Sequence, residues 1–459
     1  MKKHLLFIPC FVCSSFYMFG QNSLTTSEYS NQLIPSSSIS AVNSEITEEN
    51  NNSFTKVWTR CVADENKPAW MGTDTERGIA YANKHLYVVS RANKVNSVKI
   101  LNAKTGEDIG DLKLTSVVTG GAFAINDVET SDDNQILVAN MTTNASTIPF
   151  KIYRWKDESS EPELFLTYTA AGAYRIGDNF TVKGDLSKDA VIYAAVSTKN
   201  IVYRWMVKNG ILDKTPTEII VTLRDSKMGA CGSVAPYGIT ENDNFILNGN
   251  ALTPMECKQS GDTIGRINSS YMALLSGGMK LFEYNGGRYL FCSQFSASLG
   301  KKDSQSSILI NLTGCSLADV TESQIYGFTP ILGTTKNANS AGDVCVGIDG
   351  NDVILYTLGA NNGISAYRPA GLIPSSVSTA YIEPALIAYP NPAAEYIKIQ
   401  AADRIAVVRI FDMQGHLIMQ KSVCGLSDMV NVSALSKDLY IVEVMSDNQS
   451  KVQKMTLGK

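Results

Sequence analysis

Histidine is the residue that this chain almost lacks, and its scarcity narrows the chemistry available. Among 459 residues there are three histidines, at His4, His85 and His416. A Ser-His-Asp or Cys-His arrangement would have to use one of them, and a histidine-rich metal site cannot be built. His85 directly precedes an apolar strand-like run, where an ordinary strand-edge residue explains it. The sequence therefore predicts no metal site and no cofactor.

Other enzyme and ligand classes are excluded in the same way. The chain contains no Gly-x-Ser-x-Gly elbow, no Walker loop and no His-Glu-x-x-His helix. The formal net charge is −4, and no basic run is interleaved with aromatic residues. A nucleic-acid groove is therefore not expected. Beyond residue 20 no apolar stretch is long enough for a transmembrane span.

The first twenty residues have the pattern of a signal peptide. A short basic start precedes an apolar stretch at 5–19, and cleavage is expected between Gly20 and Gln21. Cys10 and Cys13 leave a lipoprotein as the alternative. Cleavage before either cysteine would leave strongly apolar residues at the new N-terminus, so a removed signal peptide is favoured.

Two polar segments divide the rest of the chain. Residues 21–54 are rich in Ser, Thr, Asn and Glu, a composition that favours a flexible linker. A Pro- and Ser-containing break at 372–384 predicts a second linker. The sequence therefore predicts a large domain at 55–371 and a small one at 385–459.

Cysteine is sparse enough to exclude a disulfide scaffold. An exported protein would meet oxidising conditions, so disulfides are permitted. Several cysteines lie within apolar strand-like runs, where buried free thiols are the simpler interpretation. The one pair that we predict is Cys231 with Cys257.

A repeated unit of about fifty residues fills the large domain. Each unit has a strand, a tight polar turn, a very apolar strand, a longer loop and a third strand. The apolar second strands begin near residues 86, 136, 191, 245, 289 and 353. Tyr153-Arg154-Trp155 is echoed fifty positions later by Tyr203-Arg204-Trp205. Asn, Asp and Gly in the turns tolerate the positive φ that tight hairpins require.

Units of this kind predict an all-β chain with a β-propeller of about six blades, seven being the alternative. The strand at 56–60 lies outside the six units and would complete the last blade, closing the ring. A long β-sandwich or two all-β domains would also fit the strand pattern.

Carboxylates are the one catalytic option that remains. Asp127, Glu129 and Asp185 are expected in equivalent first strands, facing the centre of the ring, and glycosidases need only two carboxylates. The sialidase signature Ser-x-Asp-x-Gly-x-Thr-Trp is missing. Polar residues at corresponding blade positions also serve to bond the backbone between blades, and this structural interpretation is favoured.

Aromatic residues suggest binding instead. Trp70, Tyr81 and Tyr237 are candidate stacking platforms for sugars. The Tyr-Arg-Trp repeats look architectural, because they recur in successive units. Aromatic residues on propeller strands also pack one blade against the next, so this role is the alternative for the three candidates.

The last seventy or so residues carry a recognisable pattern. Its residues are Tyr389, Pro390, Asn391, Pro392, Arg409, Phe411, Asp412, Gly415, Leu439 and Tyr440. With them, the segment resembles the type A C-terminal sorting domain of the type IX secretion system, found in Bacteroidetes. Asp438 stands where that family usually has glycine. The resemblance implies a small Ig-like β-sandwich that directs the protein through the outer-membrane translocon to the cell surface or medium.

The resemblance also implies partners. A sorting peptidase would remove the domain by cleavage within 372–388, and many such proteins are then attached to surface lipopolysaccharide. Residues 56–370 resemble a family of uncharacterised secreted Bacteroidetes proteins, through the segments 72–81, 126–129 and 181–185. That second resemblance implies a fold and carries no established activity.

Taken together, these features favour a cell-surface, non-enzymatic propeller that binds a glycan or a protein. A carboxylate-dependent carbohydrate-active enzyme, either a glycoside hydrolase or a lyase, is the first alternative. A structural adhesion or matrix component is the second.

Overall fold

The computed structural model describes residues 53–457, except 224–227, 273–275, 296–304, 351, 371, 373–386, 391 and 447–448. The expected signal-peptide cleavage point, most of both linkers and Asn391 lie outside the described residues. Within this part the regular structure is β-strands with short 3₁₀ turns at Ala92–Lys94, Leu317–Asp319 and Glu322–Gln324. No helix in these ranges is long and apolar enough to cross a membrane.

Six antiparallel sheets make up residues 54–369 of the described chain. The first three contain β2 (Ile79–Ala82), β3 (His85–Ser90), β4 (Ser97–Asn102) and β5 (Asp108–Asp111); β6 (Phe123–Thr130), β7 (Ile136–Met141), β8 (Phe150–Trp155) and β9 (Glu163–Tyr168); and β10 (Thr181–Gly184), β11 (Ala190–Ala195), β12 (Ile201–Lys208), β13 (Ile211–Leu212) and β14 (Thr217–Ile220). The last three contain β15 (Ser233–Pro236), β16 (Phe245–Gly249), β17 (Leu252–Cys257) and β18 (Thr263–Arg266); β19 (Ser276–Tyr284), β20 (Gly287–Phe295), β21 (Gln305–Asn311) and β22 (Ile325–Phe328); and β23 (Gly342–Asp349), β24 (Asp352–Gly359), β25 (Gly363–Pro369) and β1 (Phe54–Cys61).

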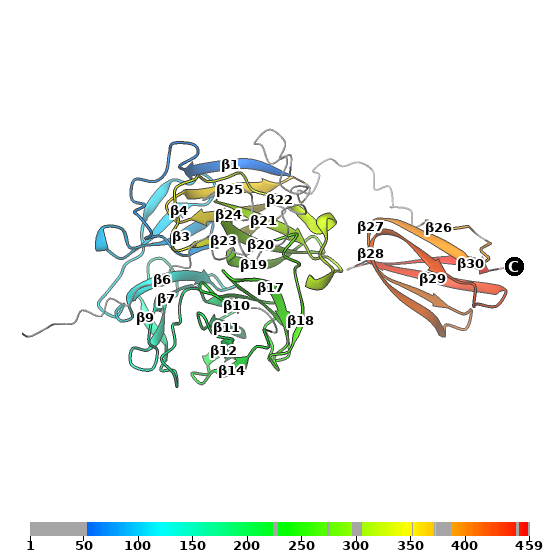
Figure 1. The fold of residues 1–459 in the computed structure, drawn as a ribbon, viewed down its shortest axis with the longest axis horizontal. Helices are drawn as coiled ribbons and strands as arrows, with labels where there is room; N and C mark the ends of the chain where they lie inside the picture. The colour runs from blue at the N-terminus through cyan, green and yellow to red at the C-terminus, as the bar shows by residue number, and fades with distance from the viewer. Residues whose placement is uncertain are drawn as a thin grey trace, which may run out of the picture. The chain divides into compact units, whose positions relative to one another are not determined.

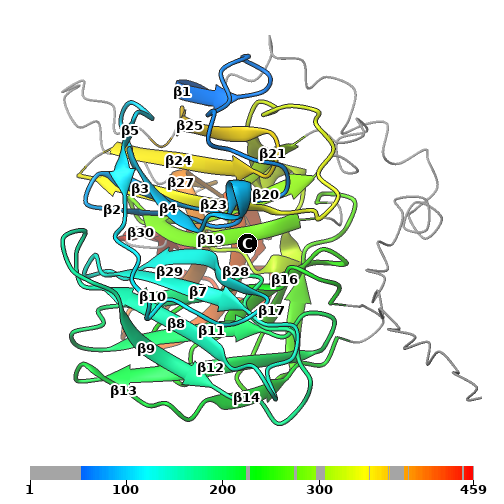
Figure 2. The same ribbon diagram turned by 90° about the vertical axis from the view of Figure 1, so that its left-hand side faces the viewer.

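The first strands of the sheets form a closed ring. Each of β2, β6, β10, β15, β19 and β23 contacts the next, and β23 contacts β2. Bonds between neighbours join start to start, as between Thr181 Oγ1 and Val234 O, or end to end, as between Thr130 Oγ1 and Tyr81 O. The six inner strands therefore run in one direction, as in a propeller, and Figure 2 shows sheets β6–β9 and β10–β14 next to one another.

The ring is closed by the N-terminal strand. β1 pairs antiparallel with β25 along its whole length and becomes the outer strand of the last sheet (Figure 1). Phe54, Trp58 and Cys61 turn their side chains into the core, while the residues between them are more exposed. This confirms the prediction that the strand at 56–60 completes the final repeat.

The second strands and the repeated tryptophans form the core between sheets. Every residue of β7 and of β11 is buried. Trp155 pairs with Ile136, and Trp205 pairs with Ile192 at the matching place in the next sheet. Both indoles are fully buried and lie in different apolar clusters, each large enough to dominate its local packing energy.

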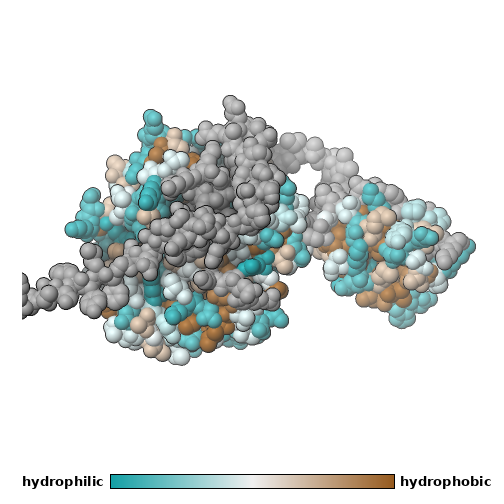
Figure 3. Space-filling view, viewed as in Figure 1, coloured by the Kyte–Doolittle hydropathy of each residue, from teal (hydrophilic) through white to brown (hydrophobic). Residues whose placement is uncertain are grey.

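The hairpin turns use the residues expected of them. Asn83, Asn134 and Asn285 all have positive φ, between 48° and 62°. Asparagine tolerates this left-handed conformation better than most residues with a side chain, which is why the turns could be located from sequence. The face of the molecule in Figure 3 intersperses hydrophilic and hydrophobic residues over the part that is coloured.

The C-terminal part is a separate five-stranded antiparallel sheet. Its strands are β26 (Ile387–Tyr389), β27 (Tyr396–Phe411), β28 (Leu417–Asn431), β29 (Asp438–Ser446) and β30 (Gln449–Leu457). Register shifts near Gln400 and Ile405 interrupt the long β27–β28 pair. Buried Ile397, Val408 and Val442 belong to its single apolar cluster. Whether this sheet is Ig-like stays a prediction.

The predicted disulfide is wrong, because Cys231 and Cys257 are both free thiols. Cys257 is buried in β17 among the apolar residues around Met228 and Phe245. Cys231 lies in the loop before β15, where its Sγ approaches the Asn339 carbonyl oxygen at 3.7 Å. The loop and the strand turn the two thiols to different surroundings.

Candidate functional site

Asp127 and Glu129 lie on the inner strand β6, as the sequence predicts. Asp127 is 1% exposed, and its Oδ2 accepts a hydrogen bond of 2.8 Å from the backbone N–H of Phe180, at the start of the next sheet. Its Oδ1 has no hydrogen-bond partner within the described chain. On the other side the carboxylate lies against Gly78 of the preceding sheet, where an added Cβ would be 2.2 Å from Oδ1. Asp127 thus joins three consecutive sheets.

Asp343 repeats this arrangement in the last sheet, and sequence reasoning missed it. Its Oδ2 accepts a 2.9 Å hydrogen bond from the Ile79 N–H of the first sheet, and it lies against Gly278 of the preceding one. The signal was present, because an Asp-Val pair begins the inner strand in both Asp127-Val128 and Asp343-Val344. Aligning the repeats by that pair would have found it.

An ion pair crosses the axis of the ring. Lys280 Nζ of β19 lies 2.6 Å from Glu129 Oε2 of β6, and these strands stand opposite one another in the order of the sheets. The two side chains are only 26% and 12% exposed. The centre of the ring is therefore spanned by a largely desolvated charge pair.

Burial sets the protonation of these carboxyl groups. Burial, and then repulsion from Asp343 and Glu129, raises the pKa of Asp127 well above its ordinary value. Burial, and then repulsion from Glu129, raises the pKa of Asp343 to about 7. Burial also raises the pKa of Glu129, although Lys280 opposes the shift. The protein thus favours the neutral form of these acids.

Asp185 is not part of this group, which corrects its expected place on an inner strand. The strand β10 ends at Gly184, and Asp185 opens the following turn. Its Oδ1 accepts the Ser187 N–H at 2.8 Å, and its Oδ2 pairs with Lys188. The same turn is held by Asp133, which accepts bonds from Leu186 and Ser187. The described residues contain no group of three or more His, Cys, Asp or Glu placed to hold a metal ion.

The three aromatic candidates do not come together. Tyr81 stacks on Tyr356 between the first and last sheets, with ring centroids 5.8 Å apart. Trp70 lies in the loop before β2, and its Nε1 donates to Asp108 Oδ1 at 3.0 Å. Tyr237 follows β15 and lies under the guanidinium of Arg288. Each aromatic ring packs within or between sheets, and a shared platform is not formed.

A second charged cluster lies at the end of the ring where the inner strands begin, which we call the amino end. The loops between second and third strands lie at this end too, because the strands are antiparallel. Arg175 precedes β10, and its guanidinium makes a two-pronged ion pair with Asp178. Arg91 follows β3, and its Nη1 donates to Asn126 Oδ1 at 2.8 Å. Sequence reasoning missed these residues, since arginine in loops carries no motif.

Arg77 completes this cluster from the segment before β2. Its Nη2 donates to the Asp74 carbonyl oxygen, but its Nη1 is buried without a hydrogen-bond partner in the described chain. Burial lowers the pKa of Arg77, and nearby Arg175 lowers it further, against the attraction of Asp74 and Asp178. A buried guanidinium nitrogen with no acceptor is costly, so it marks a place that a ligand would stabilise.

Backbone strain gathers at the same end. Residues other than Asn and Gly with positive φ include Asp74, Thr198, Cys231 and Ser340, which lie in the amino-end loops. For β-branched Thr198, at φ 65°, this is a rare conformation. Strain of this kind persists only where the surroundings impose it, and it collects at functional sites.

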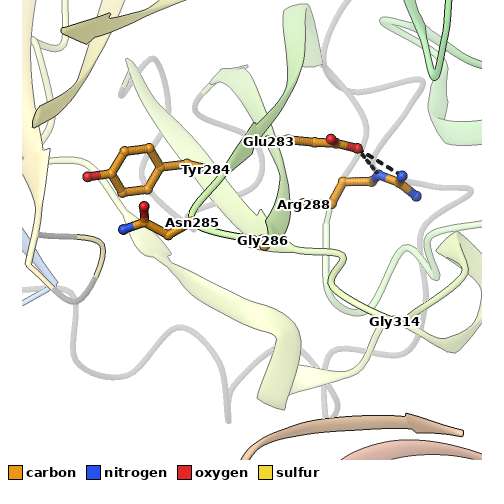
Figure 4. Close-up of a pocket in the computed structure, with 7 residues that line it drawn as sticks. Glu283, Tyr284, Asn285, Gly286, Arg288 and Gly314 are labelled. Carbon is orange, nitrogen blue, oxygen red and sulfur yellow. Dashed lines mark hydrogen bonds and ion pairs between the residues drawn. The ribbon is translucent and has the colours of Figure 1, made fainter. Parts of the chain in front are cut away.

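A shallow hollow of about 430 Å³ lies at the β19–β20 hairpin. In Figure 4, Glu283 and Arg288 pair on one side of this hairpin, while Tyr284 and Asn285 lie on the other. Four of its seven lining residues are the turn and its glycines, and no buried charge faces it. We regard it as a feature of the turn.

The predicted sorting residues occupy the C-terminal sheet. Asp412 accepts the backbone N–H groups of Gln414 and His416, and Gly415 has φ 88°, so the turn after β27 needs both residues. Arg409 Nε donates to Gln420 Oε1, and Phe411 ends β27. The remaining residues of the pattern lie on β26 and in the bend after it, or on β29: Tyr389, Pro390, Pro392, Leu439 and Tyr440.

Comparison with known proteins identifies two parts of the chain. Residues 387–457 match the secretion system C-terminal sorting domain, and residues 73–248 match a domain of unknown function, DUF8500. No curated protein matches the chain. The sorting domain marks the protein for export across the outer membrane by the type IX secretion system, to the cell surface or the extracellular space.

Solved structures share the fold. A DUF4623 family protein from Bacteroides eggerthii aligns at 18% identity and a TM-score of 0.54, over 66% of this chain and 73% of that one. An α-L-arabinanase from Penicillium chrysogenum aligns at 9% identity and 0.44, over 70% and 99%. PorZ, a surface component of the type IX secretion system of Porphyromonas gingivalis, aligns at 12% identity and 0.30, over 85% and 60%. At these identities the likeness concerns the fold alone.

Proposed function

We propose that this exported protein is a non-enzymatic surface receptor whose propeller binds a glycan or protein ligand at the amino end of the ring. The observation that carries the proposal is the buried, unpartnered Nη1 of Arg77 within the arginine cluster. Nearby Thr198 and Cys231 are held in unfavourable backbone conformations, which supports a functional role for the same loops.

The carboxylates favour architecture over catalysis. Asp127 and Asp343 each accept a backbone N–H from the next sheet, and Glu129 is paired with Lys280. A carboxylate acting on a substrate must present an oxygen to it, yet Asp127 and Asp343 are at most 6% exposed. Their contacts match those of a bond between blades.

A carboxylate-dependent carbohydrate-active enzyme remains the second candidate. One observation favours it: Asp127 and Asp343 have raised pKa values and repel one another, as paired acids do in glycoside hydrolases. Asp127 Oδ1 also lacks a partner in the described chain. An adhesion or matrix role, the third candidate, would appear as self-association of the purified protein.

The test uses the purified protein against host and microbial polysaccharides and surface proteins, scoring retention and product release together. For the proposed receptor we expect retention without products. The Asp127→Asn variant should retain the ligand, with Asp185→Asn as the control on a turn carboxylate outside the cluster. Released products that disappear in Asp127→Asn but persist in Asp185→Asn would establish the enzyme instead. Neither retention nor products would refute both and leave self-association to be measured.

Export makes a separate prediction about the mature protein. A sorting peptidase should cut within 372–388 and remove the C-terminal sheet, with attachment to surface lipopolysaccharide as the expected fate. Intact-mass analysis of the surface protein tests this. Surface material that still carries residues 387–457 would refute the cleavage.

A further inference from the structure

We propose that the ligand at the amino end is an acidic saccharide, and that the carboxylate of a single uronate-type sugar is held by Arg77 beside Arg91 and Arg175. This inference rests on the proposed function and specifies the chemistry of its ligand. It is carried by the hydrogen-bonding of the three guanidinium groups, by the balance of charge around them and by one exposed aromatic ring.

The three guanidinium groups are not equally occupied. Arg175 is committed to Asp178 through both Nε and Nη2. Arg91 donates to an amide oxygen, that of Asn126, and Arg77 donates to a backbone carbonyl. Neither Arg77 nor Arg91 makes an ion pair within the described chain, and Arg77 Nη1 makes no hydrogen bond there. An incoming carboxylate would supply the acceptor that Arg77 lacks.

The cluster is held rigidly before any ligand arrives. Ile176 bridges both Thr142 and Val196, so the Arg175 segment is hydrogen-bonded to two loops. Asn126 accepts from Arg91 and donates to the carbonyl oxygens of Gly177 and Asp178. The Asn126 amide thus connects Arg91 with the segment that carries Arg175. Preorganised donors lose little entropy when they bind an anion.

The surrounding charge limits the ligand to one carboxylate. Asp74, Glu76 and Asp178 act on the guanidinium groups of Arg77 and Arg91, so three carboxylates face three arginines. Asp74 is bound by Asn361, and Glu76 is bound by Gly72, Thr75 and Ser90. They remain in place as fixed negative charges. A densely charged polyanion or acidic peptide would be repelled, whereas one carboxylate can reach Arg77.

An aromatic ring next to the cluster favours a sugar as the carrier of that carboxylate. Phe123 begins β6 at the amino end and is 42% exposed. The guanidinium carbon of Arg91 lies 3.7 Å from the centre of this ring. Exposed aromatic rings beside arginine offer the apolar face and the cation that the two sides of a uronate sugar need. Arg77 is itself partly exposed, so a small side-chain shift brings Nη1 to the ligand.

The experiment titrates the purified full-length protein with oligomers of galacturonic, glucuronic and mannuronic acid. Each oligomer is compared with its carboxyl-reduced form, which is the same sugar without charge. Free galacturonate, inorganic phosphate and an oligoglutamate peptide are further arms that separate a sugar from a simple anion and from an acidic protein. Isothermal titration calorimetry gives the affinity, and thermal unfolding of each variant checks that it is folded.

The variants separate charge, geometry and stacking. Arg77→Gln should weaken binding of the acidic oligomer by about tenfold or more, as expected for a lost charge-assisted hydrogen bond. Arg77→Lys should recover part of it, which also answers the objection that Gln misfolds. Phe123→Leu should weaken oligomers several-fold and leave free galacturonate unchanged. Arg154→Gln, which removes an exposed pair with Glu163, is the control and should change nothing.

Several results would overturn the inference. Equal affinity for the acidic and carboxyl-reduced oligomers, or unchanged binding in Arg77→Gln, would remove the carboxylate contact. Tighter binding of phosphate or oligoglutamate than of every uronate would mean that the site reads another anion. If a neutral glycan or a protein is retained while all uronates fail, the ligand class is wrong and the receptor function stands. If nothing is retained, both are wrong.

Discussion

Two groups of buried charged residues lie around the same ring, and they differ in how their hydrogen bonds are satisfied. The carboxylates Asp127 and Asp343 accept backbone N–H groups from neighbouring sheets, and Glu129 has Lys280. At the amino end, Arg77 keeps a buried donor without a partner. The first group accounts for most of its polar atoms within the protein, whereas the second does not.

The comparison separates architecture from function by a physical criterion. Burial alone does not mark a site, since both groups are buried and both have shifted pKa values. A buried charge bonded to the backbone of the next repeat stabilises the ring. A buried charge that lacks a partner lowers stability until a ligand supplies one. If this reading is right, changes in the carboxylate group should alter stability and changes in the arginine group should alter binding.

The largest effect is expected at Gly78, which lies against Asp127. In Gly78→Ala the new Cβ would be 2.2 Å from Asp127 Oδ1 and 2.5 Å from the Val128 backbone nitrogen. The backbone cannot yield as a flexible side chain can, so sheets must separate. We expect a loss of about 3 kcal/mol or more in the free energy of unfolding, measured by urea titration.

Gly110→Ala is the matched control for this prediction. Gly110 lies in the outer strand β5, where an added Cβ meets nothing within 4 Å. Its effect should stay within about 0.5 kcal/mol. Tryptophan fluorescence serves as the readout, because all four tryptophans, at 58, 70, 155 and 205, belong to the ring. A Gly78→Ala protein as stable as Gly110→Ala would show that Asp127 does not hold the sheets together.

The fold could be predicted because its signals are local and repeated. Alternation of strands with Asn- and Gly-containing turns located the units, and the isolated strand at 56–60 required a partner that β25 supplies. The misplacement of Asp185 came from one residue of strand length, since β10 ends at Gly184. The predicted cysteine pair failed because its members were chosen by proximity in sequence, while the thiols lie in unlike surroundings.

The candidate site was only partly predictable. Asp127 and Glu129 were found because they lie on a repeated strand, and Asp343 was missed although the same Asp-Val pair introduces it. The arginine cluster could not be found, since Arg77, Arg91 and Arg175 come from loops of separate repeats. Ring closure alone brings them together. Such a site has no sequence spacing, because its geometry depends on how sheets pack.

The second effect in size is expected at the ion pair across the axis. Lys280→Met leaves Glu129 largely buried without its cation, and breaking a buried pair typically costs about 3 kcal/mol. The double variant Lys280→Met/Glu129→Gln should recover more than half of that loss, because no uncompensated charge remains. Lys113→Met is the control: its pair with Glu161 is exposed, and it should cost less than about 1 kcal/mol. A double variant no more stable than Lys280→Met would contradict the pairing.

The smallest effect concerns the pH dependence of stability, through Asp343. An aspartate in the unfolded chain titrates near pH 4, whereas burial and Glu129 raise the pKa of Asp343 to about 7 in the fold. Between these pH values the unfolded chain releases a proton that the folded protein keeps. The contribution of Asp343 is therefore largest below about pH 4 and is lost as the pH rises towards 7.

Asp343→Asn isolates this contribution, because an amide oxygen can still accept from the Ile79 N–H. Other carboxylates, such as Asp352 beside Arg368, have lowered pKa values and make stability rise with pH. The quantity to measure is thus the difference between wild type and Asp343→Asn in urea titrations from pH 4 to 8. We expect the wild type to lose at least about 1.4 kcal/mol relative to the variant over this range. A constant difference would mean that Asp343 is already ionised in the fold, despite Asp127, Glu129 and Lys280 around it, and that the two buried groups are held by the same kind of charge.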